Sequence, residues 1–362
     1  MIDEGTIIRG TYTVERLLGE GAFAEVYRVR HRFLGRQAMK VFRSQEMSLE
    51  ETEELLAEPC LLSRIGHPNI VRVFEANLMD EELSSRAYFT MEYVAGGTLH
   101  DFWQAHAAEF VPLDVAIDVV RQVCRGVAVA HSQSPPIVHR DIKPHNILIG
   151  YDESGLRVRV SDFGLAKKVN PLTLLASARG TRAFKPPEFL SNVDSPAGDV
   201  WAIGSTLYML LTDRLPFPAA GELAPSDTSI WKQPMIPASR LNTLVDAKLD
   251  AILQRALALR LADRFPDAAA MLDALETWRP AKQQAKGGCD ADSMTSTTSK
   301  GDARSADHSE AAQMIGEAIR LSRQAGRLTE AADYLEQTIN RQPSLRPEYE
   351  PLLRLWRRDV TM

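Results

Sequence analysis

The segment from Ile137 to Leu148 holds the densest group of reactive side chains in the sequence. A carboxylate at Asp141, an ammonium at Lys143 and an amide at Asn146 lie close together between two apolar runs. A carboxylate can orient a hydroxyl group and accept its proton, a cation can steady a moving phosphoryl group, and an amide oxygen can bind Mg²⁺. The spacing therefore predicts a loop that supports phosphoryl transfer.

A second carboxylate follows at the end of an expected strand, in the sequence Val160-Ser161-Asp162-Phe163-Gly164. Asp162 is therefore placed where a metal could bind. With Asn146 it would supply two magnesium ligands to a single active site.

Two further features suggest a phosphate site near the N-terminus. Two glycines, at Gly19 and Gly21, stand where a strand turns back, and without a Cβ the backbone N–H groups can approach phosphate oxygens. Lys40 follows nineteen residues after Gly21, between apolar strand positions. Taken alone, the glycines could be an ordinary turn and the lysine a solvated strand residue; their proximity favours a phosphate-binding pair.

The elements that would position these groups fall into two units. Residues 12–43 alternate apolar and polar types between glycine turns, and 71–74 and 88–93 also read as strands. Residues 48–65 read as a helix, with Ser48 and Glu51 as a capping box. After residue 97 the pattern becomes mainly helical, most clearly at 115–131, 200–211 and 249–259. This predicts an α+β protein with a β-rich lobe, a helical lobe and a shared cleft.

Composition narrows the class of protein further. The chain has 362 residues, 44% hydrophobic and 25% charged, with a net charge of −6 and no basic block. These values favour a globular protein and give no reason to expect nucleic acid as a partner. Three scattered cysteines build no disulfide framework, and neither a signal peptide nor a membrane span is apparent. We expect a cytoplasmic protein without a membrane partner.

The C-terminal part changes character twice. Residues 281–310 are rich in Lys, Gln, Gly, Asp, Ser and Thr, with little to bury, which is typical of a flexible linker. Helical periodicity resumes at Ala311, and the stretch from Gly326 to Pro343 resembles a tetratricopeptide unit. Because one such hairpin cannot bury both faces, it must pack on something. It could dock on the preceding lobes or dimerise, or it could recruit a protein partner.

The motifs and their order identify the sequence as resembling eukaryotic-like Ser/Thr protein kinases of the type common in bacteria. The resemblance covers residues 12–279 and rests on the glycine turn, Ala38-Met39-Lys40, His139-Arg140-Asp141, Asp162-Phe163-Gly164 and Pro187-Glu188. It implies a bilobal protein kinase fold over residues 1–280, with an N-lobe at 1–94 and a C-lobe at 95–280. The linker at 281–310 and a helical tail at 311–362 would follow.

The resemblance also implies roles for the polar residues. Asp141 would be the catalytic base, Lys143 would steady the γ-phosphate of ATP, and Asn146 and Asp162 would hold Mg²⁺. Lys40 would contact the α- and β-phosphates and pair with Glu58. The other residues expected to bind the nucleotide are Gly19, Glu20, Gly21, Ala22, Phe23, Ala24, Val26, Ala38, the gatekeeper Met91, and the hinge residues Glu92 and Val94.

Substrate class and control are implied in the same way. Lys143 and Thr181 match kinases that phosphorylate Ser or Thr of proteins, and Arg140 matches those in which an arginine receives an activation-loop phosphate. Thr173 and Ser177 are the candidate sites for self-phosphorylation, although either could be an ordinary loop hydroxyl. Structural roles are implied for Thr181, Glu188, Asp199 and Arg264, the second and last forming a buried ion pair.

Departures from the pattern leave alternatives open. Pro59 directly follows Glu58, and a proline inside a helix removes a backbone donor, so Glu54 is a second candidate partner for Lys40 and the enzyme could be gated. A pseudokinase scaffold acting through the tail would be expected to lack Lys40, Asp141 or Asp162, yet all three are present. A small-molecule kinase would not be expected to keep Gly180-Thr181 and Pro187-Glu188. Arg182 and Lys185 make the expected peptide-docking segment basic.

Overall fold

The computed structural model describes most of the chain. The described residues are 1–21, 24–43, 49–79, 86–106, 110–152, 155–163, 182–191, 193–217, 231, 233–280, 311, 314–322 and 327–357. The expected linker therefore lies outside them.

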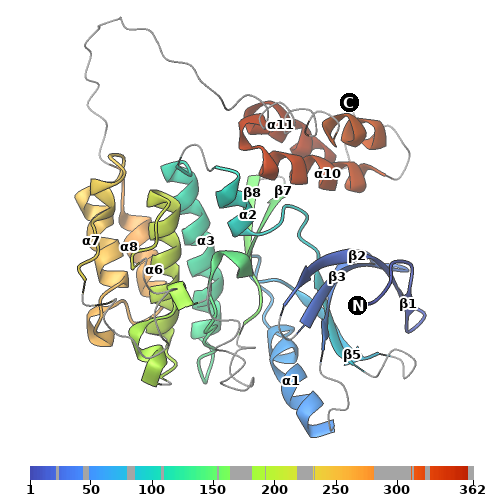
Figure 1. Ribbon diagram of the computed structural model, residues 1–362, viewed down its shortest axis with the longest axis horizontal. Coiled ribbons are helices and arrows are strands. Elements are labelled where there is room, and N and C mark those ends of the chain that lie inside the picture. Colours follow the sequence, from blue (N-terminus) through green and yellow to red (C-terminus); the bar gives the residue numbers. More distant parts are fainter. Residues whose placement is uncertain are drawn as a thin grey trace, which may run out of the picture.

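The N-lobe is a six-stranded antiparallel sheet in the order β1-β2-β3-β4-β6-β5 (Figure 1). Its strands are β1 (Ile7–Ile8), β2 (Tyr12–Glu20), β3 (Ala24–His31), β4 (Gly35–Phe42), β5 (Val73–Leu78) and β6 (Ala87–Glu92). Alternating residues of β2 and β3 are buried, as the two-residue period of a half-buried strand requires. The prediction of a β-rich first lobe is confirmed.

One strand of the N-lobe differs from the sequence prediction, and its helix contains a proline. The strand expected at 71–74 begins only at Val73, because the Val71 amide donates to the Val160 carbonyl of the other lobe. Helix α1 (Leu49–Leu62) is a single helix that includes Pro59. Pro59 is buried and lines a small cavity with Leu62 and Phe89, so the helix continues through it although its ring nitrogen donates no hydrogen bond.

The C-lobe is mainly helical and carries one two-stranded hairpin. Its helices are α2 (Leu99–Gln104), α3 (Leu113–His131), α6 (Pro196–Thr212), α7 (Ala247–Ala256) and α8 (Ala268–Thr277), and its strands are β7 (Ile147–Asp152) and β8 (Gly155–Val160). Short 3₁₀ turns are Pro144–Asn146, Arg182–Phe184, Pro187–Ser191, Ala238–Arg240 and Leu261–Asp263. Nearly every residue of α6 is buried, which makes this helix the centre of the lobe.

The tail forms helices α10 (Leu328–Arg341) and α11 (Arg346–Arg357), joined by the turn Pro343–Leu345, and residues 314–322 are also helical. These helices lie over the β7–β8 hairpin and beside the N-lobe sheet (Figure 1). Apolar tail residues such as Leu335, Ile339 and Trp356 belong to the same hydrophobic core as the C-lobe. Of the alternatives left open by the sequence, the structure shows docking of the tail on the two preceding lobes.

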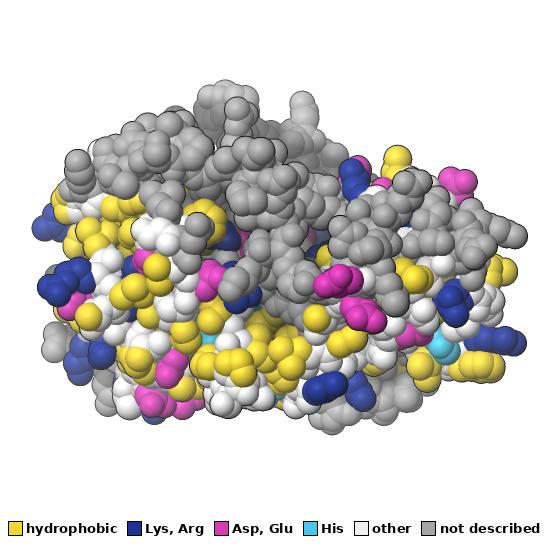
Figure 2. Space-filling model, turned by 90° about the horizontal axis from the view of Figure 1, so that it is seen from below, with side chains coloured by type: hydrophobic (Ala, Val, Ile, Leu, Met, Phe, Trp, Pro, Cys, Tyr) yellow, Lys and Arg dark blue, Asp and Glu magenta, His cyan; other side chains and the backbone are white. Residues whose placement is uncertain are grey.

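The surface carries mixed charge. On the face drawn in Figure 2, basic and acidic side chains are interspersed among hydrophobic ones. No helix among the described residues is long and apolar enough to cross a membrane.

Candidate active site

The buried carboxylate of Asp199, on α6, fixes the loop that contains Asp141. Asp199 accepts hydrogen bonds from the backbone amides of His139 (2.7 Å) and Arg140 (2.9 Å). It also accepts one from Nε2 of His131, whose Nδ1 accepts from the Ala268 amide. Asp199 is 2% exposed, so these bonds are shielded from water and the loop is held rigidly. The structural role expected for Asp199 fits this arrangement.

His139 joins this loop to the segment that carries Asp162. Its Nε2 donates to the Ser161 carbonyl (2.8 Å), and its Nδ1 accepts from the Asp141 amide (3.2 Å). Burial lowers the pKa of His139, which keeps the ring neutral and able to accept at Nδ1. The ring also packs on Phe163 at 4.5 Å between centroids. The two carboxylate-bearing segments are therefore positioned together.

The carboxylate of Asp141 meets two ammonium groups. Lys143 Nζ lies 2.8 Å from Oδ2, and Lys185 Nζ lies 3.1 Å from Oδ1. Nδ2 of Asn146 donates to Oδ2 (3.0 Å) and to the Asp141 carbonyl (2.8 Å). Asp141, Lys143 and Asn146 are therefore brought together as the sequence predicted.

Lys185 is the member of this cluster that sequence reasoning did not place at the base. It directly follows the turn Arg182–Phe184 and also donates to the Arg140 carbonyl. Burial acts to raise the pKa of Asp141, but Lys185 and then Lys143 outweigh it and hold that pKa below its usual range. Asp141 is thus kept ionised, as a proton acceptor must be.

Lys40 and Asp162 meet across the cleft between the lobes. Nζ of Lys40, on β4, lies 2.6 Å from Oδ1 of Asp162. Asp162 has a positive φ of 58° and Arg140 one of 67°, a costly backbone geometry that is typical of functional segments. The side chain of Glu58 lies outside the described residues, so its pairing with Lys40 stays a prediction, as does that of Glu54.

The described residues expected to bind the nucleotide lie on or next to the strands of the N-lobe sheet. Gly21 donates its amide to the Ala24 carbonyl (2.8 Å) in the β2–β3 turn, and Val26 pairs with Lys40 across the sheet. Gly19 and Glu20 end β2, Ala38 lies on β4, and Glu92 ends β6 just before Val94. Behind Met91 is a cavity of about 20 Å³ that reaches Asp162.

The remaining residues predicted from the sequence lie in the C-lobe or outside the described part of the chain. Arg264 forms a bidentate pair with Glu188 at 2.6 and 2.7 Å, and the guanidinium side chain is 0% exposed. Arg140, expected to await a phosphate, donates from Nε to Asp194 at 2.8 Å. Five expected residues lie outside the described part of the chain: Ala22, Phe23, Thr173, Ser177 and Thr181.

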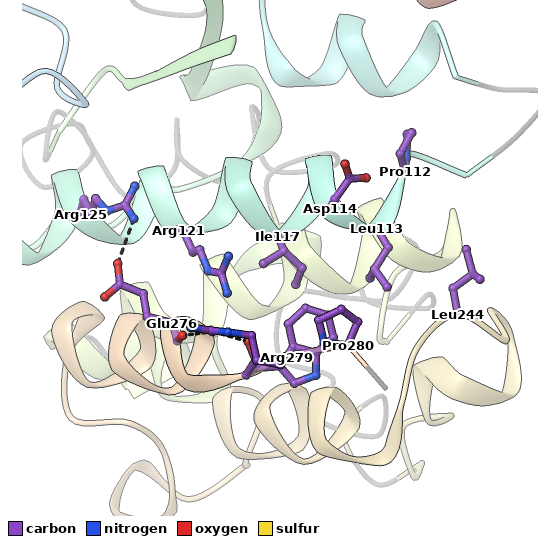
Figure 3. A pocket seen from close by; sticks show the side chains of 11 residues that line it. Pro112, Leu113, Asp114, Ile117, Arg121, Arg125, Leu244, Glu276, Arg279 and Pro280 are labelled. Carbon is purple, nitrogen blue, oxygen red and sulfur yellow. Dashed lines mark hydrogen bonds and ion pairs between the residues drawn. The ribbon is translucent and has the colours of Figure 1, made fainter. Parts of the chain in front are cut away.

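A larger groove of about 820 Å³ lies elsewhere, between α3 and the end of α8 (Figure 3). Arg121, Arg125 and Arg279 line it together with Glu276, which pairs with Arg125 at 2.9 Å. None of the residues expected to do chemistry lines this groove.

The comparison with protein families decides the class. The family model of the protein kinase domain matches residues 12–354. The chain belongs to the protein kinase family. This kinase is 26% identical to the solved kinase domain of Mycobacterium tuberculosis PknI, with a TM-score of 0.57 over 76% of this chain and 99% of that one. The bilobal kinase fold predicted from the sequence is confirmed.

Among curated proteins, the kinase resembles "Serine/threonine-protein kinase ATG1c" of Arabidopsis thaliana, at 32% identity over 58% of this chain and 28% of that protein. It also resembles the human "SNF-related serine/threonine-protein kinase", at 33% identity over 59% of this chain and 27% of that protein. The chain thus spans less than a third of the length of these relatives.

Proposed function

We propose that this kinase transfers the γ-phosphate of ATP to Ser or Thr residues of protein substrates, with Mg²⁺, as an enzyme of class EC 2.7.11. The single observation that carries the proposal is the Asp141 carboxylate, ionised and flanked by Lys143 and Asn146 in the cleft that the Lys40–Asp162 pair spans. The Ser/Thr kinases among its relatives support the acceptor class.

Each side chain has a role in this proposal. Asp141 accepts a hydrogen bond from the substrate hydroxyl, orients its oxygen toward the phosphorus and takes its proton as the new bond forms. Lys143 lies close enough to Asp141 (2.8 Å) to neutralise charge on the transferred group, and Lys40 binds the phosphates that remain on the nucleotide. The adenine would lie against the hinge at Glu92 and Val94.

The donor set of the cleft fits Mg²⁺. Nδ2 of Asn146 donates to Asp141, so Oδ1 of Asn146 is left as a possible metal ligand. Asp162 already binds a cation, because the Lys40 ammonium lies 2.6 Å from its carboxylate. Among the residues that the structure describes, no three His, Cys, Asp or Glu side chains form a metal cluster, so phosphate oxygens must complete the coordination. When bound, Mg²⁺ would neutralise phosphate charge.

The proposal extends to self-phosphorylation at Thr173 or Ser177 and to a reducing, cytoplasmic location. The free thiols of Cys60 and Cys124 are compatible with that location.

The test is incubation of the purified protein with ATP and Mg²⁺, beside the Asp141→Asn variant, followed by intact mass and phosphosite mapping. We expect phosphate on Ser or Thr of the wild type alone. A wild-type protein that phosphorylates neither itself nor a generic protein substrate would overturn the proposal.

A further inference from the structure

Helix α10 lies along the outer side of the hinge and contacts both lobes. On the N-lobe, Arg36 of β4 pairs with Glu330 (3.3 Å) and Asp333 (3.2 Å) of α10. On the C-lobe, the Tyr151 amide of β7 donates to Glu336 Oε1 at 3.0 Å. One helix is thus fixed to two bodies that a kinase must hold at a defined angle to form its cleft.

Beyond these two anchors, toward its C-terminal end, α10 also contacts the hinge segment. Asn340 Nδ2 donates to the Gly96 carbonyl (2.7 Å), and Gln337 Nε2 donates to the Tyr93 hydroxyl (3.2 Å). A Cβ added at Gly96 would lie 2.0 Å from Asn340 Nδ2 and 2.3 Å from the Ile149 carbonyl. The absence of a side chain at Gly96 is what allows the helix to approach so closely.

These contacts are buried and polar, unlike those of a simple hydrophobic cap. Asp333, Glu336 and Asn340 are 6%, 1% and 3% exposed. A buried polar group is costly unless it is paired, and these three are aimed at one arginine and two backbone groups of the kinase lobes. The contact therefore specifies one position of the tail relative to the hinge.

Helix α11 locks α10 in place. Arg357 pairs with Asp333 at 2.9 Å and also with Glu336, so α11 holds the same two carboxylates that face the lobes. Arg346 at the other end of α11 lies over the rings of Phe102 (5.2 Å) and Tyr151 (5.5 Å). The hairpin acts as one rigid unit.

We propose that the α10–α11 hairpin is an intramolecular hinge brace whose docking holds the lobes in the orientation that binds the nucleotide. The Lys40–Asp162 contact at 2.6 Å crosses the same cleft and is the part of the active site that this orientation controls. The inference rests on the proposed nucleotide site. When the brace is loosened, the binding-competent orientation is populated less, and the apparent dissociation constant rises by the same factor.

The test measures binding of a non-hydrolysable ATP analogue with Mg²⁺ to the full chain, so that it does not depend on phosphoryl transfer. Asn340→Ala and Arg36→Gln loosen the brace from its two sides. Glu317→Gln is the matched control, because Glu317 is exposed and pairs with Arg320 of its own helix. Hydrogen exchange at the Tyr151 amide reports docking directly, and circular dichroism confirms that each variant is folded.

We expect both brace variants to speed exchange at Tyr151 and to raise the dissociation constant about 5-fold or more, with the control unchanged. Faster exchange with an unchanged or lower dissociation constant would overturn the brace and leave the hairpin as a structural cap. Unchanged exchange in both folded variants would overturn the contact itself. A wild type that binds no nucleotide, yet shows the expected exchange pattern, would instead count against the proposed function.

Discussion

Ionisation of Glu336 should weaken the fold as the pH rises, which is the reverse of the usual behaviour of a carboxylate. Its side chain is 2% exposed. Burial raises its pKa from 4.5 to about 7, because desolvation outweighs the attraction of Arg357 and Asp333 adds repulsion. The folded protein therefore keeps the Glu336 proton over a range in which the unfolded chain has lost it.

The sign and size of the effect follow from these two pKa values. Below pH 4.5 the carboxyl is protonated in both states, so the full stability is present. Between pH 4.5 and 7 the free energy of unfolding falls, and the total loss is about 3 kcal/mol at about 1.4 kcal/mol per pKa unit. Above pH 7 both states are ionised and the loss is complete.

Glu336→Gln separates this group from every other titration. The amide cannot ionise, but it can still accept the Tyr151 hydrogen bond. Urea denaturation of both proteins from about pH 5.5 to 8 should show the wild type losing about 2 kcal/mol more than the variant. Glu317→Gln, an exposed exchange on the same tail, should run parallel to the wild type. If the free energy of unfolding of Glu336→Gln also changes with pH in parallel with that of the wild type, the reasoning is refuted. Arg357 would then keep Glu336 ionised over the whole range.

Three further outcomes are expected at the active site and its support. Asp141→Asn should lower kcat about 10²- to 10⁴-fold without changing the melting temperature, and a small loss would show that another group takes the proton. Lys185→Met should move the acidic limb of the kcat/KM profile to higher pH, because Asp141 loses the cation that most lowers its pKa; an unmoved limb argues against that contact. Arg264→Ala should cost about 3 to 5 kcal/mol by leaving Glu188 buried without its partner, and adding Glu188→Gln should recover part of the loss in a thermal melt. If nothing is recovered, the buried charge is not the cause.

The local sequence predicts most of the arrangement within the catalytic loop, but few of the contacts that other segments make with it. Asp141, Lys143 and Asn146 lie within six residues, so their proximity could be predicted from spacing alone. Lys185 reaches Asp141 from 44 residues away, a distance that no pattern of spacing encodes. Pro59 shows a different limit. Its cost to a helix can be predicted from the sequence, but its buried position beside Phe89 and Val160 depends on strands that are distant in the sequence.

The tail contains a sequence pattern that indicates a polar helix face but does not show what that face contacts. Glu330, Asp333, Gln337 and Asn340 recur every three or four residues, which places them on one face of a helix. A polar stripe of this kind usually faces solvent, so its burial against the hinge could not be inferred without the fold. The sequence did predict that the hairpin must pack on something, and the structure shows the surface.

The position of α10 also has a consequence for the order in which the protein is made. The lobes end near Pro280, whereas α10 begins at Leu328, so the ribosome adds nearly fifty more residues before this helix exists. At ordinary rates of synthesis that interval is roughly 2 to 10 s, long enough for the lobes to fold first. During that interval Gly96 would be uncovered and the Tyr151 amide would lack its Glu336 partner, so the cleft would acquire its final support only after α10 and α11 are made.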